Sequence, residues 1–318
     1  MHERDRVGGG VPPRFPRLRR APDPRALLRR HPRGPAIRAG DLHGPGEGLF
    51  GQEEEAPRPA GEDGGCIEGG ERGLKIAILS DVHSNGDALA AVARELDAHR
   101  VERIYHLGDL AGYGAEPERC VQWARERTSG GILGNHDAVA CGKSEGERFN
   151  APALVAARWS AGRLSPSSRA YLGSLPDRLA VEEAFLLVHG SPSDPDRYLF
   201  TLDDAVEELD SLAADPRVRI AFFGHTHVPA AVIRRRDGST VSVSPSETVL
   251  KDGETALFNP GSVGQPRDRN PEASFLVFDT RSRKASWLRT PYDIEASMRK
   301  ILEAGLPRFF ATRLAEGT

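Results

Sequence analysis

Five short segments of the chain carry aspartate, asparagine and histidine at spacings that favour metal binding. Asp81-Val82-His83 and His225-Thr226-His227 each place two donor side chains two residues apart, so that both point to the same side of an extended chain. The other three segments are Gly108-Asp109, Gly134-Asn135-His136-Asp137 and Val188-His189-Gly190. Imidazole and carboxylate are common ligands of divalent transition metals, and asparagine can add a neutral oxygen. The segments together predict a metal site.

The candidate ligands outnumber the roughly four that hold a single zinc ion. They are Asp81, His83, Asp109, Asn135, His189, His225 and His227. Two divalent cations that share one carboxylate, which we expect to be Asp109, would use all of them. Two metal ions about 3.5–4 Å apart recur in enzymes that hydrolyse phosphate esters, because their charge stabilises the hydroxide that attacks phosphorus. The mixed nitrogen and oxygen donors suit manganese, our first expectation, and also Fe, Zn, Co or Ni.

All five segments follow stretches that have the pattern of β-strands. Apolar runs and helical spacing alternate in the first half of the chain, which predicts a β-α-β-α-β order. The predicted elements are a strand over Leu74–Ser80, a helix over Asp87–His99, a strand over Arg103–Leu107, a helix over Glu116–Arg127 and a strand over Gly131–Leu133. In open α/β sheets ligands bind where strands end, so we expect one site at that edge.

The second half of the chain is predicted to be richer in strands. Helical segments are expected over about Asn150–Leu175, and a last helix is expected over Asp293–Ala304. Between them, another helix is expected to begin after Thr201, which would cap it. Strands are expected over Arg178–Val188, Arg219–Phe223, Ala231–Arg235, Thr240–Val243, Ala256–Phe258 and Ser274–Asp279. The segments Cys141–Leu175 and Ser191–Phe200 are expected to determine substrate specificity, but neither contains a pattern that names a substrate.

Residues 1–73 differ in composition from residues 74–318. They hold ten of the 24 prolines and fifteen of the 34 glycines, together with scattered arginine and acidic residues. Such a segment cannot bury enough apolar surface to offset its chain entropy. We expect a disordered tail over 1–73 and one folded domain over 74–318. An alternative hypothesis is that residues 1–73 are an upstream translation artefact.

Composition favours a protein of the cytoplasm without a membrane segment. The chain has 43 Lys and Arg residues against 46 Asp and Glu residues. This near-balance of charge gives no indication of nucleic acid or an anionic membrane as a partner. No apolar run approaches the roughly 20 residues of a membrane helix. The three cysteines form no metal-type pair, and their odd number suits a reducing compartment. The oligomeric state cannot be derived from these features.

The five segments appear in the order Asp-x-His, Gly-Asp, Gly-Asn-His-Asp, His and Gly-His-x-His. With this ordered set, the chain from Leu74 to about Arg267 resembles the calcineurin-like metallophosphoesterases. The resemblance implies an α/β fold, a β-sandwich flanked by helices on both faces in four αββα layers. It also implies a proton-donating role for His136. One metal would be held by Asp81, His83, Asp109 and His227, and a second by Asp109, Asn135, His189 and His225.

Two further features point to one branch of that family. The segment Asn259–Arg267 resembles a loop of the small bacterial, phosphodiesterase-like members, and Arg267 could clamp phosphate because a guanidinium pairs with two oxygens at once. Ser/Thr protein phosphatases of the family carry an Asp-Arg pair where this chain has Gly112 and Tyr113. Support for His136 must then come from elsewhere, and Asp137 is a candidate by proximity alone.

The sequence therefore predicts a two-metal-dependent phosphoesterase, by preference a phosphodiesterase that acts on a small phosphorylated substrate. A Ser/Thr protein phosphatase or a dinucleoside polyphosphate hydrolase is the alternative with the same chemistry, and the missing Asp-Arg pair weighs against it. A non-catalytic scaffold of the same fold is a third interpretation. Such scaffolds lose metal-site histidines, whereas every expected ligand is present here.

Overall fold

The computed structural model describes residues 73–181, 185–213 and 217–318. The predicted tail therefore lies outside the described residues, apart from Gly73. Among the described residues, no helix combines the length and the apolar character that a membrane span requires.

The apolar run after Gly73 forms β1 (Lys75–Leu79), a strand that is buried on both faces. Ile76 and Ile78 point into a core shared with a second sheet, whereas Ala77 and Leu79 point into a core beneath helices. Alternate residues of a strand face opposite sides of its sheet, so a continuous apolar run needs apolar neighbours on both sides. This strand therefore fixes a layered architecture.

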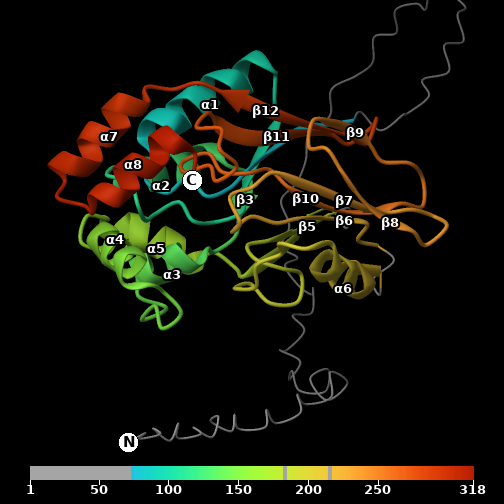
Figure 1. The fold of residues 1–318 in the computed structure, drawn as a ribbon, viewed down its shortest axis with the longest axis horizontal. Helices are drawn as coiled ribbons and strands as arrows, with labels where there is room; N and C mark the ends of the chain where they lie inside the picture. The colour runs from blue at the N-terminus through green and yellow to red at the C-terminus, as the bar shows by residue number, and fades with distance from the viewer. Residues whose placement is uncertain (1–72, 182–184, 214–216) are drawn as a thin grey trace, which may run out of the picture. The chain divides into compact units, whose positions relative to one another are not determined.

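The described strands form two mixed six-stranded sheets (Figure 1). The first has the order β3 (Gly130–Gly131), β2 (Arg103–His106), β1, β11 (Ala273–Asp279), β12 (Lys284–Thr290) and β9 (Glu247–Val249). The second has the order β4 (Arg178–Val181), β5 (Phe185–Val188), β6 (Ile220–Phe222), β10 (Thr255–Asn259), β7 (Ala230–Arg234) and β8 (Thr240–Val243). Phe222 lies between the sheets, where its ring meets Phe185, Phe258 and Phe278.

Helices cover the outer faces of both sheets (Figure 1). α1 (Gly86–Ala98) contacts β11 and β12, and α6 (Leu202–Ala213) contacts β7, β8 and β10. The remaining helices are α2 (Pro117–Arg127), α3 (Asn135–Cys141), α4 (Ala151–Ala161), α5 (Pro166–Ser174), α7 (Ile294–Glu303) and α8 (Arg308–Glu316). The predicted four-layer αββα arrangement is confirmed.

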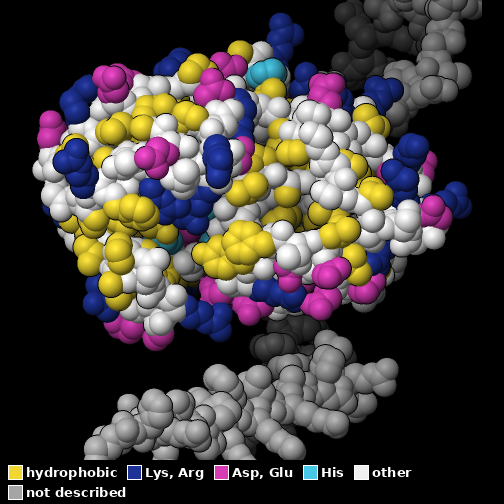
Figure 2. All heavy atoms as spheres, in the orientation of Figure 1, with side chains coloured by type: hydrophobic (Ala, Val, Ile, Leu, Met, Phe, Trp, Pro, Cys, Tyr) yellow, Lys and Arg dark blue, Asp and Glu magenta, His cyan; other side chains and the backbone are white. Residues whose placement is uncertain are grey.

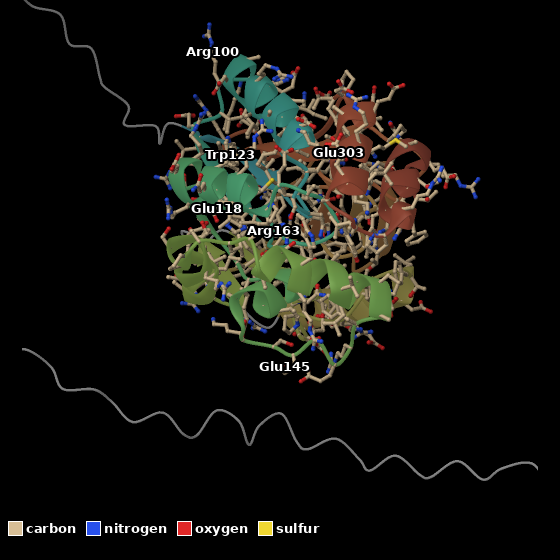
Figure 3. All side chains as sticks on the ribbon, turned by 90° about the vertical axis from the view of Figure 1, so that its left-hand side faces the viewer. Arg100, Glu118, Trp123, Glu145, Arg163 and Glu303 are labelled. Carbon is tan, nitrogen blue, oxygen red and sulfur yellow. The ribbon has the colours of Figure 1, made fainter. Side chains whose placement is uncertain are left out.

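Figure 3 views the helical side of the molecule, with Glu118 of α2 among the labelled side chains. The Glu118 carboxylate accepts hydrogen bonds from the Ser165 amide at 2.8 Å and from the Ser168 hydroxyl at 2.9 Å. Ser165 also caps the first turn of α5 by accepting from the Ser168 amide. A single carboxylate therefore ties the start of α5 to α2.

Several predicted elements differ from those observed. Arg178–Val188 is not one strand but the hairpin β4–β5, and the predicted last helix is followed by α8. α3, β9 and β12 were not predicted. β12 is only partly buried along most of its length, so it lacks the apolar run that marks β1. The cap at Thr201 is confirmed, because its hydroxyl accepts from the Asp204 amide at 3.1 Å.

Strand direction brings the predicted site segments together. β1, β2 and β3 run parallel in the first sheet, and β5, β6 and β10 run parallel in the second. The five donor segments follow β1, β2, β3, β5 and β6, and the loop that contains Arg267 follows β10. The loop after β10 is hydrogen-bonded to the end of β1 and the loop that follows it. The Val263 amide donates to the Ser80 carbonyl and the Gly264 amide to the Asp81 carbonyl, both at 3.0 Å. The carboxyl ends of six strands thus meet at one edge of the sandwich.

Candidate metal centre

The structure brings all the predicted metal ligands to that edge. Most of these side chains are buried, and Asn135 is half-buried. Two clusters made only of predicted ligands form there, Asp81 with His83 and His227, and Asp109 with His189 and His225. A third group of possible ligands overlaps both clusters and joins His83 and Asp109 with His136. Within each cluster the candidate ligand atoms lie within 4.8 Å of one another.

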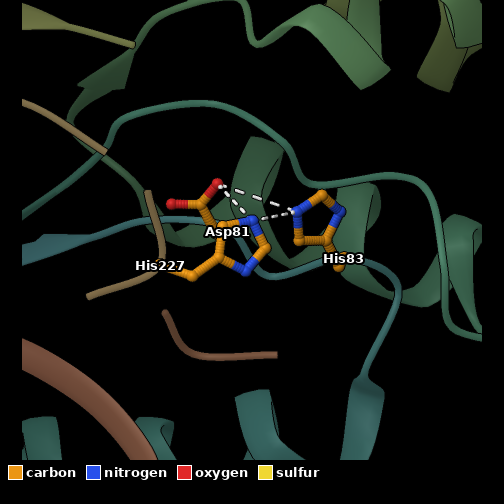
Figure 4. Close-up of side chains that lie close together, drawn as sticks. All are labelled: Asp81, His83 and His227. Atoms are coloured by element: carbon orange, nitrogen blue, oxygen red, sulfur yellow. Dashed lines mark hydrogen bonds and ion pairs between the residues drawn. The ribbon is translucent and has the colours of Figure 1, made fainter. Parts of the chain in front are cut away.

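The first cluster joins residues that follow β1 and β6 (Figure 4). The Nε2 atoms of His83 and His227 are 3.1 Å apart. Asp81 Oδ1 lies 3.3 Å from Nε2 of His227 and 3.7 Å from Nε2 of His83. Three donor atoms from two sheets therefore face one small volume.

The second cluster is centred on His189, which follows β5. Its Nε2 lies 3.0 Å from Asn135 Oδ1, 3.0 Å from His225 Nδ1 and 3.4 Å from Asp109 Oδ2. Asn135 is the first residue of α3, so the start of that helix adds the neutral oxygen that the sequence predicted.

Asp109 lies between the two clusters. Its Oδ2 is 3.4 Å from Nε2 of His189 and 3.6 Å from Nε2 of His83. Its Oδ1 accepts a hydrogen bond from the His136 amide at 2.9 Å. One carboxylate oxygen thus faces both clusters while the backbone of α3 holds the other, which is the placement that a shared ligand requires.

Three of the histidines are oriented by backbone carbonyls. The Nδ1 atoms of His83, His189 and His227 lie 3.0, 2.7 and 2.6 Å from the carbonyl oxygens of Ala111, Leu107 and Gln265. A carbonyl can only accept, so each Nδ1 carries a proton, and each Nε2 is the ring nitrogen that presents a lone pair whenever the imidazole is neutral. This arrangement is characteristic of metal-binding histidines.

The geometry of the first cluster fits a divalent cation. The Nε2 lone pairs of His83 and His227 face each other, and they share their space with Asp81 Oδ1, a buried oxygen that has no hydrogen-bond partner among the described residues. Lone pairs and a carboxylate repel one another when nothing positive lies between them. A cation bound by these atoms would convert the repulsion into coordination.

Backbone strain is concentrated in the same residues. Asp81, His83, Asp109, His225 and His227 have φ values of 53°, 46°, 55°, 65° and 61°. The left-handed region is uncommon for residues other than glycine and costs about 1–3 kcal/mol each, so the surroundings must hold them there. The His83 amide, for example, donates to the Asp109 carbonyl at 2.8 Å.

Electrostatics favours the charged form of the Asp109 carboxylate and the neutral form of the His225 and His227 imidazoles. Burial alone would raise the pKa of Asp109, but His189 and His136 outweigh it and hold this pKa well below its usual range. Burial lowers the pKa of His227 well below its usual value, with Arg267 adding to the effect, and burial with the nearby His189 lowers the pKa of His225 to about 3. His189 differs from these two histidines. The nearby Asp109 carboxylate outweighs the effect of burial and raises the pKa of His189 to about 10.

His136 lies beside the two clusters in the first turn of α3. Its ring centroid is 4.8 Å from that of His83 and 4.5 Å from that of Tyr113. Burial lowers the pKa of His136 to about 3. Its buried Nδ1 has no hydrogen-bond partner among the residues that the structure describes.

Asp137 does not support His136. Its carboxylate accepts from the Leu110 amide at 3.2 Å and from the Ala111 amide at 2.9 Å, which fixes the turn that carries Asp109. Burial and the nearby Asp109 raise the pKa of Asp137 to about 7. The suggestion drawn from its proximity in sequence was wrong, because successive residues of a helix point in different directions.

Gly112 and Tyr113 pack against His136 instead. A Cβ atom at Gly112, whose φ is +94°, would lie 2.3 Å from His136 Nδ1, so only glycine leaves room for the imidazole. Tyr113 also meets Phe310 of α8 at 4.8 Å between ring centroids. The two departures from the protein-phosphatase pattern thus form the pocket that holds His136.

Arg267 lies next to this pocket. Its guanidinium donates to the Tyr113 hydroxyl at 3.4 Å and to Gln265 Oε1 at 3.3 Å, and its Nε is buried without a partner among the described residues. The Arg267 amide donates to the His227 carbonyl at 3.2 Å, which ties its loop to the metal-site segment after β6. The guanidinium retains an unused donor close to the candidate ligands.

A cleft of about 350 Å³ adjoins the second cluster, because Asn135 and His225 are among its lining residues. Arg148 and Phe149, before α4, and Asp196 and Tyr198, before α6, also line it, and Arg148 pairs with Asp196 at 3.2 Å. Figure 2 shows histidine side chains at the bottom of a hollow, flanked by Lys and Arg and by hydrophobic side chains. Arg148, Phe149, Asp196 and Tyr198 fall within the two segments that the sequence singled out for specificity, but Phe149 and Tyr198 become visible as lining residues only when the chain is folded.

Comparisons with known proteins agree with this site. The family model of the calcineurin-like phosphoesterase superfamily domain matches residues 74–283. An uncharacterized protein from Methanocaldococcus jannaschii is 32% identical over 247 residues, which cover 76% of this chain and 98% of that protein. The crystal structure of a metallophosphoesterase from Sphaerobacter thermophilus is 33% identical, with a TM-score of 0.66 over 78% of this chain and all of that one.

A second solved structure, of a hypothetical protein from Pyrococcus horikoshii, is 18% identical with a TM-score of 0.63 over 77% of this chain and 99% of that one. At this identity the likeness shows the fold alone. The family match and the first solved structure, together with the clustered donors, identify the chemistry as metal-dependent hydrolysis of phosphoric esters. The chain belongs to the calcineurin-like phosphoesterase superfamily.

Proposed function

We propose that this hydrolase is a phosphodiesterase with two divalent metal ions. The position of Asp109 between the two clusters carries the proposal of two ions. One ion would be held by Asp81, His83, Asp109 and His227, and the other by Asp109, Asn135, His189 and His225. Manganese is the first candidate and Fe, Zn, Co and Ni are alternatives. The free cysteines Cys120 and Cys141 suit the reducing cytoplasm, where we propose that the protein acts.

The side chains around the ions would divide the remaining work. When bound, the ions supply Lewis acidity and lower the pKa of water at the site. Arg267 would hold a phosphoryl oxygen through its unused donor and stabilise the charge that develops there. His136, close to His83 and excluded from solvent, would deliver a proton to the leaving oxygen. Burial lowers the pKa of the free imidazole, and the negative charge of a bound phosphate ester beside the ring would favour its protonated form.

Preference for a diester is supported by the cleft at the second cluster. A phosphodiester carries two organic groups, and one of them must remain beside the site while the other leaves. The cleft of about 350 Å³ has Asn135 and His225 among its lining residues and offers room for such a group. At the position of the phosphatase arginine, Tyr113 brings no second positive charge for the extra charge of a monoester.

The test compares hydrolysis of bis-p-nitrophenyl phosphate with hydrolysis of p-nitrophenyl phosphate by the purified full chain with added manganese. We expect a higher kcat/KM for the diester, and loss of both activities when a chelator removes the metal. A higher kcat/KM for the monoester, or for phosphopeptides, would contradict the diester proposal and favour a phosphatase. Activity that survives complete removal of metal would contradict the metal mechanism itself.

Replacement of Arg267 tests the phosphate clamp. We expect Arg267→Ala to lower kcat/KM by about 10–100-fold, because a charge-assisted hydrogen bond contributes about 1.5–3 kcal/mol. Arg267→Lys should recover only part of the loss, since an ammonium group cannot pair with two oxygens at once. Arg269→Ala, in an exposed residue of the same loop, is the matched control. Steady-state kinetics with unchanged kcat/KM for Arg267→Ala would exclude the clamp.

A further inference from the structure

His225 differs from the other three candidate histidine ligands in how its ring is held. Their Nδ1 atoms lie within hydrogen-bond distance of backbone carbonyls, which fixes each imidazole. In His225 it is Nδ1 that faces the cluster, 3.0 Å from His189 Nε2. Within the described part of the chain, the structure gives no hydrogen bond from its Nε2 to any partner. Hydrogen bonding therefore leaves the orientation of this ring unexplained.

An aromatic stack covers the His225 ring instead. The Tyr198 ring lies 3.8 Å from it between centroids, with 27° between the planes, and the Phe200 ring lies 5.1 Å from Tyr198 at 7°. Tyr198 is 42% exposed and Phe200 is 70% exposed. Neither belongs to a hydrophobic core cluster, although Leu199 between them does. Packing of the core therefore does not account for the two rings.

The segment that carries Tyr198 is fixed on both sides, by Arg197 before it and by the Phe200 amide after it, which donates to Asp204 Oδ2 at 3.3 Å. Arg197 pairs with Asp204 at 3.2 Å, with Glu207 at 2.7 Å and with the buried Glu208 at 3.2 Å, all on α6. The Arg197 amide donates to the Asp194 carbonyl at 3.1 Å, which closes a turn just before Tyr198. The Tyr198 backbone is therefore anchored to α6, and its ring can act as a rigid surface.

We propose that Tyr198, backed by Phe200, is a positioning residue that holds the His225 imidazole in its metal-binding orientation. A flat ring in contact with the imidazole face restricts rotation about the bond between Cβ and the ring, which is the task that carbonyl acceptors perform for the other three histidines. The stack also shields this ligand from water. The proposal rests on the proposed function, because it takes His225 to be a ligand of the second ion.

The test is calorimetric titration of manganese into metal-free protein, for the full chain and its variants. We expect Tyr198→Ala to weaken binding of one of the two ions by about 10–100-fold, the usual effect of losing a group that orients a ligand. Tyr198→Phe keeps the ring and should bind like the unmodified protein. Tyr198→Leu keeps bulk without a flat ring and should resemble the alanine variant. Leu202→Ala, a neighbouring exposed residue without a ring, should change nothing.

Activity at different manganese concentrations provides a second readout. The manganese concentration that gives half-maximal turnover should rise about 10–100-fold in Tyr198→Ala and stay unchanged in Tyr198→Phe. A general loss of structure would lower turnover at every manganese concentration. His225→Ala separates the two proposals. If His225→Ala loses one ion while Tyr198→Ala binds both with unchanged affinity, the positioning role is wrong and the metal site stands. If His225→Ala also binds both ions with unchanged affinity, the proposed metal site and the positioning role are both wrong.

Discussion

Asp109→Asn is expected to remove metal-dependent hydrolysis, with turnover at least about 10³-fold lower, since two-metal catalysis supplies several kcal/mol of transition-state stabilisation. The Asp109 carboxylate faces both clusters, at 3.4 Å from His189 and 3.6 Å from His83. The amide of asparagine has nearly the same shape but no charge. Its oxygen can still accept the hydrogen bond that Asp109 Oδ1 receives from the His136 amide, so the start of α3 should remain in place.

Metal content after dialysis is the direct measurement for this variant. Asp109→Asn should retain less metal than the unmodified protein, because both ions lose charge from a shared ligand. Asp97→Asn is the matched control, since Asp97 is a surface carboxylate paired only with Arg127 among the described residues, and such pairs contribute little. Full metal content together with full activity in Asp109→Asn would show that the bridging assignment is wrong.

The clustering of the candidate ligands could be predicted from the sequence because its signals are local. Asp81 and His83 follow an apolar run directly, and the order of strand and ligand repeats along the chain. The rule that ligands lie where parallel strands end then placed the segments at one edge. Their left-handed backbone conformations could not be predicted, because aspartate and histidine adopt them here only under the constraint of tertiary hydrogen bonds.

Contacts between loops were beyond prediction for the same reason. Asp137 is adjacent to His136 in sequence, yet its carboxylate bonds to the turn after β2. Tyr198 meets His225 across 27 positions of the chain, and α8 brings Phe310 against Tyr113. No periodicity or spacing encodes such encounters, because they depend on how separately predictable elements pack.

If His136 acts as the proposed general acid, its pocket would hold the imidazole in place without a carboxylate partner. Gly112 allows the imidazole to lie directly over the backbone, and Tyr113 and Phe149 flank it at 4.5 and 4.6 Å between ring centroids. Rings that pack from two sides restrict the imidazole, much as Tyr198 is proposed to restrict His225. Aromatic contact would then take the place of hydrogen bonding at two positions of the same site.

His136→Ala is expected to lower kcat by about 10²–10⁴-fold for a diester with an alkyl leaving group, because an alkoxide needs a proton as it leaves. The loss should be much smaller for a p-nitrophenolate leaving group, which is stable without one. Metal binding should be unchanged, since the bond to Asp109 Oδ1 comes from the His136 backbone amide and survives the substitution. His99→Ala, at an exposed histidine outside the clusters, is the control. The comparison of leaving groups distinguishes the roles: an equal loss for both esters would indicate that His136 supports the site structurally, whereas a loss confined to the alkyl ester is the signature of proton donation.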